Sequence, residues 1–150
     1  MKFILTREVG RLVRWLRILG FDTRYFKEDK AASLIIEALR DDRVIVTRNH
    51  RLPEARGIKV VLLKTEKIKE QICEFFTGVG IAYDPRRMFT RCIICNDELI
   101  PIDKPRVKNL VPEYVYNTQK NFTTCPHCKK IYWQGTHWGN VVKILEDIKQ

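Results

Sequence analysis

The stretch VIVTRNHR, residues 44–51, begins as an apolar run and turns polar and basic at Thr47. Its first part, Val44–Thr47, is rich in β-branched residues and predicts a buried strand. In open sheets of parallel strands, ligands bind beyond the carboxyl ends of the strands, where the loops diverge. The polar residues that follow Thr47 are therefore expected to lie at a binding site.

Apolar strands and amphipathic helices alternate on both sides of this stretch, as far as about residue 77. Further strands are predicted at Phe3–Leu5, Phe21–Phe26 and Ile58–Leu63. Apolar residues at helical spacing predict three helices, built on Val9, Leu12, Val13, Leu16 and Leu19, on Ala31, Leu34, Ile35 and Ala38, and on Ile68, Ile72, Phe75 and Phe76. This order predicts an α/β fold with a mainly parallel sheet that is flanked by helices.

The segment GVGIAYDPRRMFT, residues 78–90, contains glycines and a proline and is typical of a joint between two modules. We therefore expect an α/β domain at residues 1–88 and a smaller domain at residues 89–150. The apolar positions Val141, Ile144, Leu145 and Ile148 predict a closing helix. This helix is expected to pack against one of the two domains.

The composition of the chain favours a polyanionic partner. The 150 residues include 28 Lys and Arg against 18 Asp and Glu, which gives a formal net charge of +10. Such a charge favours RNA or another nucleic acid, and a basic protein of unrelated function is the alternative. Neither a membrane span nor a secretory signal is evident, so we expect a cytoplasmic protein without a membrane partner. The oligomeric state is not fixed by the sequence.

Two Cys-x-x-Cys pairs carry the strongest signal in the chain. Each pair places two thiolates on one turn, and two such turns make the tetrahedral site that zinc prefers. The predicted zinc ligands are Cys92, Cys95, Cys125 and Cys128. Since four thiolates complete the coordination, the zinc is expected to be structural. Two disulfides, or His127 in place of one sulfur, are the alternatives, and Cys73 is expected to be a buried free thiol.

Basic residues form two further candidate RNA contacts. Arg7, Arg11, Arg14 and Arg17 recur every three or four residues and share one face of the first helix, with Glu8 as the acid close by. These arginines repel one another, which favours RNA phosphates as partners; a solvated helix face is the alternative. Beyond the second cysteine pair, lysines precede aromatic residues that either stack on unpaired bases or fill a small core. They are Lys129, Lys130, Tyr132, Trp133, His137 and Trp138.

Several short motifs spread over almost the whole chain occur together. They are Gly10-Arg11-Leu12, Trp15-Leu16-Arg17, Gly20-Phe21-Asp22-Thr23, Asp29, Thr47-Arg48, Arg91-Cys92-x-x-Cys95-Asn96 and Trp133-x-Gly135-Thr136-His137-Trp138. In this combination the sequence resembles the Mut-seven carboxyl-terminal ribonuclease-domain family. The resemblance implies a PIN-like α/β nuclease fold, a zinc ribbon after it, RNA as the substrate, and acids at the strand ends that hold Mg²⁺ or Mn²⁺.

The sequence departs from that family pattern at two strand ends. Thr6 stands where the first strand usually ends in an aspartate, and Asn49 stands where the third strand usually continues Thr-Arg-Asp. The resemblance leaves Asp29, together with Asp22, as the candidate catalytic residues. Two negative charges are thereby absent from a strand end that keeps several basic residues, so the pocket is expected to suit an anion.

The candidate RNA contacts at this strand end are Arg48, Asn49, His50 and Arg51, which can donate hydrogen bonds to phosphates. The predicted function is an RNA-binding protein with a degenerate acidic centre, which binds structured or ribosomal RNA without cutting it. The main alternative is an active metal-dependent ribonuclease that uses Asp29 with a reduced set of Mg²⁺ or Mn²⁺ ligands. Metal-free cleavage with His50 as general base, and a protein adaptor, are further alternatives.

Overall fold

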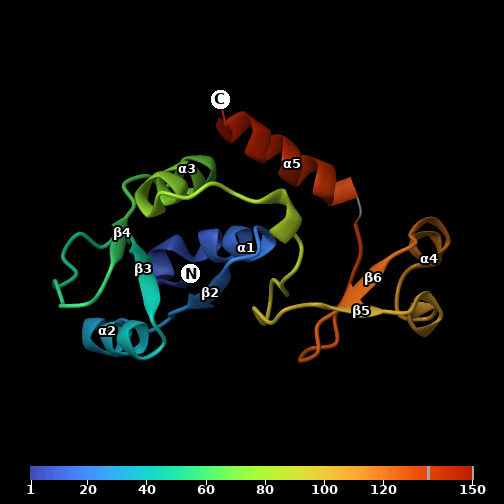
Figure 1. Ribbon diagram of the computed structural model, residues 1–150, viewed down its shortest axis with the longest axis horizontal. Helices are drawn as coiled ribbons and strands as arrows, with labels where there is room; N and C mark the ends of the chain where they lie inside the picture. Colours follow the sequence, from blue (N-terminus) through green and yellow to red (C-terminus); the bar gives the residue numbers. More distant parts are fainter. Residues whose placement is uncertain (135, 150) are drawn as a thin grey trace.

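The computed structural model describes residues 1–134 and 136–149 (Figure 1). Gly135 and the side chains of His137 and Trp138, which the sequence motifs include, lie outside the described part. The first elements are β1 (Lys2–Leu5), η1 (Arg7–Val9), α1 (Gly10–Ile18), β2 (Asp22–Tyr25), α2 (Ala31–Arg40), β3 (Arg43–Thr47), β4 (Val60–Leu62) and α3 (Ile68–Val79). They are followed by η2 (Pro85–Arg87), β5 (Ile100–Ile102), η3 (Lys104–Val107), α4 (Glu113–Thr118), β6 (Phe122–Thr124), β7 (Ile131–Tyr132) and α5 (Thr136–Lys149).

The first four strands form a parallel sheet in the order β2-β1-β3-β4, so the predicted α/β fold class is confirmed. Side chains alternate between the two faces of each strand. Phe3 and Leu5 of β1 belong to the core that α1 and α3 cover, whereas Ile4 packs with α2 on the other face. Figure 1 shows α2 on the opposite side of the sheet from α1 and α3. Both faces are thus covered, as parallel sheets require.

The larger core contains a cluster of phenylalanine rings. Phe75 of α3 packs edge-on against Phe3 at 4.9 Å and against Phe21 at 5.6 Å between ring centroids. Val141 and Leu145 of α5 are buried in the same core, and Figure 1 shows α5 beside α3. The predicted closing helix therefore packs on the sheet domain. Cys73 of α3 is only half-buried, so the expectation of a buried thiol is wrong.

The second part of the chain contains a small antiparallel sheet in the order β5-β6-β7. Its own core is formed by Val107, Val115 and Phe122, which are all buried. These three residues come from η3, α4 and β6. A core of this size contributes little folding free energy, so such a module usually needs a metal site as well. The division of the chain at residue 88 stays a prediction.

The end of α1 is joined tightly to the segment that leads into the second part. Gly20 has φ +91, and a Cβ atom there would lie 2.2 Å from the carbonyl oxygen of Arg87. Gly80, which ends α3, has a similar φ of +77, but a Cβ atom there would meet nothing within 4 Å. Both glycines therefore adopt a positive φ that favours glycine, but only Gly20 lacks room for a side chain.

This difference predicts unequal effects of the same substitution. Gly80→Ala is expected to lower the free energy of unfolding by about 1–2 kcal/mol, because alanine disfavours positive φ. Gly20→Ala is expected to lower it by about 3 kcal/mol or more, because the methyl group also displaces the Arg87 carbonyl. Urea unfolding of both variants measures the difference. Equal losses would contradict the close packing of Gly20 on Arg87.

Candidate functional site

Two buried hydroxyl groups meet at the carboxyl edge of the sheet. Because β1 pairs with β3 in parallel, with Leu5 opposite Val46, the next residue of each chain segment lies at the same edge. These residues are Thr6 and Thr47, and their Oγ1 atoms are 2.8 Å apart. Both side chains are buried, Thr47 completely. The strand end where the family pattern usually has an aspartate therefore presents two hydroxyl groups in this chain.

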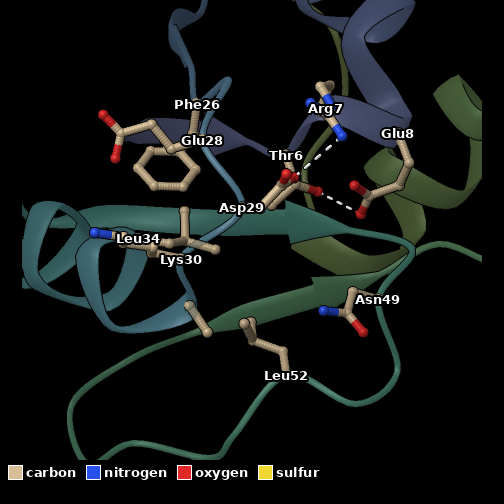
Figure 2. A pocket seen from close by; sticks show the side chains of 11 residues that line it. Thr6, Arg7, Glu8, Phe26, Glu28, Asp29, Lys30, Leu34, Asn49 and Leu52 are labelled. Atoms are coloured by element: carbon tan, nitrogen blue, oxygen red, sulfur yellow. Dashed lines mark hydrogen bonds and ion pairs between the residues drawn. The ribbon is translucent and has the colours of Figure 1, made fainter.

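A carboxylate that the sequence prediction did not assign to this edge completes the group. Oε1 of Glu8 lies 2.5 Å from the Thr6 hydroxyl (Figure 2). The same oxygen lies 2.6 Å from the Thr47 hydroxyl and 3.1 Å from the Arg48 backbone nitrogen. Burial raises the pKa of the Glu8 carboxyl, but the hydrogen bonds from Thr47 and Thr6 outweigh burial, and the pKa lies below its ordinary value of 4.5. Glu8 is thus ionised at neutral pH. The sequence signal that could have identified Glu8 is its position just after the end of the first predicted strand.

Asp29 lines the same hollow but is engaged by an arginine. Its Oδ1 atom lies 3.2 Å from Arg7 Nη2, and both side chains are largely exposed (Figure 2). The hollow has a volume of about 300 Å³ and is lined by Thr6, Arg7, Glu8, Glu28, Asp29, Lys30 and Asn49, among others. The sequence prediction left Asp29, together with Asp22, as the candidate acids; the hollow contains Asp29 with Glu8 and Glu28, and Asp22 is not among its lining residues.

The polar loop after β3 begins with a tight turn. The backbone nitrogen of Asn49 donates to Thr47 Oγ1 at 3.0 Å, and Asn49 Oδ1 accepts from the Arg51 backbone nitrogen at 3.0 Å. The guanidinium of Arg48 lies 3.4 Å from Glu66 and is partly exposed. His50 and Arg51 are exposed. The structure therefore brings Asn49 to the hollow and leaves two basic side chains open to solvent beside it.

The arginine stripe of the first helix divides into two parts. Arg7, Arg11 and Arg14 line a second hollow of about 630 Å³, together with Trp15 and Tyr25. Arg17 does not join them. Its Nε donates to the carbonyl of Thr23 at 3.0 Å, and its Nη1 donates to the carbonyls of Ile93 and Ile94 at 2.9 and 3.1 Å. The hydrogen bonds of Arg17 thus join the two parts of the chain, and the four arginines as RNA contacts stay a prediction.

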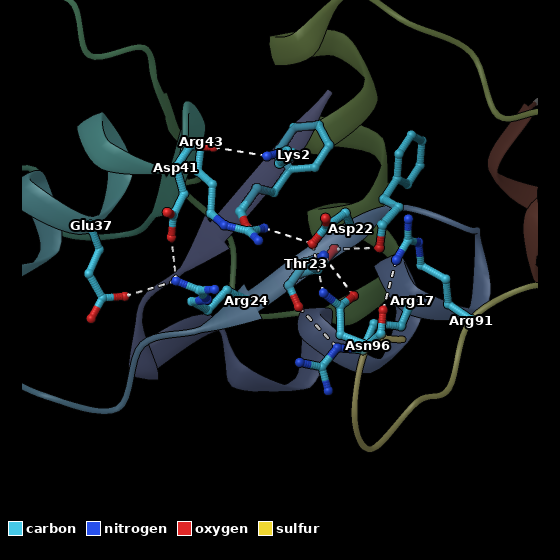
Figure 3. Close-up of polar contacts among 12 residues, drawn as sticks. Lys2, Arg17, Asp22, Thr23, Arg24, Glu37, Asp41, Arg43, Arg91 and Asn96 are labelled. Atoms are coloured by element: carbon cyan, nitrogen blue, oxygen red, sulfur yellow. Dashed lines mark hydrogen bonds and ion pairs between the residues drawn. The ribbon is translucent and has the colours of Figure 1, made fainter. Parts of the chain in front are cut away.

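Asp22 lies at the other end of the sheet from Asp29. It begins β2 and pairs with Lys2, the first residue of β1, so it faces the amino edge. Its Oδ1 accepts from Arg43 Nη1 at 2.8 Å and from Asn96 Nδ2 at 2.7 Å (Figure 3). Burial raises the pKa of Asp22, but the hydrogen bonds from Arg43 and Asn96 outweigh it, and the pKa is lowered. The two candidate catalytic acids are therefore not brought together.

The first cysteine turn docks on β2, which is an edge strand. Asn96, at a φ of 69, accepts from the backbone nitrogen of Thr23 at 2.9 Å. Arg91 donates to the carbonyls of Gly20 and Asn96 at 3.2 and 2.7 Å (Figure 3). With Arg17 these contacts provide partners for backbone groups at the edge of the sheet, which would otherwise be open to another chain.

The four cysteines of the two Cys-x-x-Cys pairs come together. Their Sγ atoms all lie within 4.8 Å of one another, and the Cys92 and Cys128 sulfurs are 3.7 Å apart. A tetrahedral zinc site with Zn–S bonds of about 2.3 Å has sulfur atoms about 3.8 Å apart, so the arrangement fits that ion. The Tyr132 hydroxyl lies 3.1 Å from Cys92 Sγ and adds an outer hydrogen bond. The predicted grouping of the four cysteines is confirmed, and together they could hold a metal; zinc as that metal stays a prediction.

The lysines beside the second turn lie far from the strand-end residues. Lys129 and Lys130 are exposed, and the Lys130 ammonium lies 5.5 Å from the centre of the Tyr132 ring. Figure 1 shows β5 and β6 next to α4, which lies at one end of the long axis, and the loop between β3 and β4 at the other end. A partner that touched both regions would have to be large, as a folded RNA is.

Taken together, the parallel sheet, the polar hollow at its carboxyl edge and the four-cysteine group define an α/β domain followed by a module that could hold a metal. A family model described as the Mut7-C RNAse domain matches residues 1–145, and the chain belongs to that family. The resemblance found in the sequence is confirmed. Membership supports a ribonuclease-like or RNA-binding role with RNA as the partner.

No curated protein and no solved structure matches the chain. Among the described residues, no helix combines the length and apolar character needed to cross a membrane.

The cysteine site predicts a metal-dependent second domain. Elemental analysis of the purified protein is expected to return about one zinc ion per chain, because four thiolates complete a tetrahedral site. A chelator is expected to expose the amides of β5–β7 to hydrogen exchange before those of β1–β4, since the parallel sheet has its own large apolar core. Freshly purified protein without metal, or exchange unaffected by chelation, would refute the prediction.

The docking role of Asp22 predicts a pH effect on stability. Its pKa in the folded protein is lowered from the ordinary value of 3.8, so its stabilising effect is present above that value and is lost as the pH falls through the folded pKa. Asp22→Asn is expected to lower the free energy of unfolding at pH 7 by about 1–3 kcal/mol and to flatten its decline below about pH 4.

Thermal or urea unfolding between pH 2 and 7 measures this effect at roughly half-unit steps. Asp29→Asn is the matched control, because its ion pair with Arg7 is exposed and is expected to contribute less than about 0.5 kcal/mol. If both variants lost the same small amount, Asp22 would have no structural role.

Proposed function

We propose that the protein binds structured RNA, with ribosomal RNA as one such target, and holds it without cutting it. The observation that carries the proposal is the chemistry of the strand ends, where Thr6 and Asn49 replace the acids of the family pattern. In the part of the chain that the structure describes, the four cysteines form the one close group of three or more metal-ligating side chains. The acids of the hollow form no such group.

The contacts of the remaining acids weaken a catalytic metal site further. Mg²⁺ and Mn²⁺ are hard cations that need several oxygen ligands. Oε1 of Glu8 already accepts three hydrogen bonds, and Oδ1 of Asp29 is paired with Arg7. A divalent ion would have to displace these partners or bind through one oxygen of each carboxylate. Such a ligand set is small for an ion that must also activate water.

Basic side chains at the two hollows, which share Arg7 and Glu8 in their lining, and in the loop after β3 supply the contacts for RNA. Arg11 and Arg14 are exposed and line the second hollow with the half-buried Trp15. His50 and Arg51 are exposed beside the first hollow. Arginines bind phosphates in a bidentate manner, and an aromatic ring stacks on an unpaired base. This combination suits a folded RNA that presents both a backbone and the bases of a loop.

A metal-dependent ribonuclease is the second candidate, and one observation favours it. Glu8 and Asp29 line the same hollow, and the lowered pKa of Glu8 keeps its carboxylate ionised. With Mg²⁺ or Mn²⁺ held there, the ion would polarise a phosphate and activate water. Asp29 would then be an essential ligand.

Incubation of the zinc-loaded protein with a labelled RNA hairpin and Mn²⁺ separates the two candidates. We expect the RNA to be retained on a filter and to stay intact on a gel. The double variant Arg11→Gln with Arg14→Gln is expected to weaken retention and to reduce the slope of log affinity against log salt by about two, because each phosphate contact releases roughly one counterion. Arg40→Gln, an exposed arginine of α2 on the other face, is the control.

Two outcomes would contradict the proposal. Cleavage that requires Mn²⁺ and disappears in Asp29→Asn would establish the ribonuclease. Absence of retention at physiological salt would remove RNA binding as the function, whatever the state of the metal.

A further inference from the structure

Three hydrogen-bond donors converge on one point at the carboxyl edge of the sheet. They are the hydroxyls of Thr6 and Thr47 and the backbone N–H of Arg48, and all three lie within 3.1 Å of Glu8 Oε1. Thr47 is completely buried, and Thr6 is nearly so. Buried hydroxyls that face outward at a sheet edge need an acceptor. This set therefore forms a receptor for one anionic oxygen, and in the structure the side chain of Glu8 supplies that oxygen.

The occupant is held by these hydrogen bonds more than by packing. Glu8 lies in the short helix η1 and is exposed as a residue, whereas its donors are fixed by the paired strands β1 and β3. The donors are thus held by the sheet, whereas their occupant is the side chain of an exposed residue in a short helix. A phosphate oxygen accepts charge-assisted hydrogen bonds from hydroxyl and amide donors just as a carboxylate oxygen does.

A second observation concerns the residue that supplies the third donor. Arg48 has a buried Nε–H without a hydrogen-bond partner among the described residues, and buried donors are normally paired. Its backbone amide is already directed at the receptor. The Arg48 segment therefore contains one unpaired buried donor, the side-chain Nε–H, besides the backbone amide that faces the receptor.

We propose that Thr6, Thr47 and Arg48 form a binding site for one RNA phosphate, which Glu8 occupies in the free protein and leaves when RNA binds. This inference rests on the proposed RNA binding and specifies how the carboxyl edge takes part in it. Glu8 then acts as an internal competitor, so the site opens to a phosphate only when the competitor is displaced. The apparent affinity for RNA then equals the affinity of the open site multiplied by the fraction of molecules in which the site is open.

The charges around the hollow are consistent with a site for which the Glu8 carboxylate and a phosphate compete. Besides Glu8, its charged lining residues are the basic Arg7 and Lys30 and the acidic Glu28 and Asp29. Asp29 forms an ion pair with Arg7. A phosphate at the receptor would therefore replace one anion by another and leave the local balance similar. Removal of the Glu8 carboxylate would shift that balance toward a bound anion.

The first arm of the test measures the affinity of the full-length zinc-loaded chain for a labelled RNA hairpin. Glu8→Ala is expected to bind about tenfold more tightly or better, and Glu8→Gln is expected to show a smaller gain, because an amide competes less well than a carboxylate. Glu54→Gln removes the same charge from the loop between β3 and β4, outside the lining of the hollow, and is expected to change affinity by about twofold or less. Adding Thr47→Val to Glu8→Ala is expected to abolish the gain.

The second arm does not depend on RNA. Inorganic phosphate is titrated into ¹⁵N-labelled protein while the amide signal of Arg48 is followed by NMR. In Glu8→Ala this signal is expected to shift in a saturable manner, and in the wild-type protein the response is expected to be about tenfold weaker.

The outcomes of the two arms are distinct. Unchanged or weaker RNA binding by Glu8→Ala, or an Arg48 amide that responds equally to phosphate in both proteins or in neither, overturns the inference. Wild-type RNA binding and the proposed function would then still stand. If phosphate shifts Arg48 in Glu8→Ala and no form of the protein retains RNA, the anion site is supported and the proposed function fails.

Discussion

Parallel pairing of β1 with β3 determines which side chains share the carboxyl edge of the sheet. Leu5 lies opposite Val46, so Thr6 meets Thr47 directly beyond the paired residues. Their buried hydroxyls require an acceptor, and Glu8 reaches back across a short turn to provide it. The site follows from this register, because donors at the strand ends organise an anion where carboxylates would organise a cation.

The carboxyl ends and the amino ends of the parallel strands differ in what they bind. The carboxyl edge carries the hollow with Glu8 and Asp29, and the amino edge of β2 receives the first cysteine turn through Asp22 and Asn96. After the metal-binding module the chain returns to the sheet domain, where Leu145 of α5 is buried in the core beneath α3. The metal-binding module is thus tied to the sheet at both of its ends. Among the strands of the parallel sheet, β2 is therefore the one that depends on the metal-binding module, through the contacts of Asn96.

Much of the fold followed from local patterns in the sequence. Apolar runs and helical spacing predicted the order of strands and helices, and the cysteine pairs predicted the metal site, because these signals lie within a few residues of one another. The roles of Arg17 and Asp22 did not follow. Asp22 bonds to Asn96, 74 residues away, and periodicity shows which face a side chain shares without showing what covers it. Glu8 was missed because its role depends on the register of two strands that are distant in sequence.

The electrostatic character of the strand ends is tested most directly by Mn²⁺, which broadens the NMR signals of residues around the place where it binds. The amides of Thr6, Glu8 and Asn49 in the zinc-loaded protein are the reporters. We predict that sub-millimolar Mn²⁺ leaves these signals as sharp as those of α4, which does not line the hollow, since too few carboxylate oxygens are available to bind the ion. Selective broadening of the three reporters would show a cation site at the carboxyl edge and would contradict the assignment of that edge to an anion.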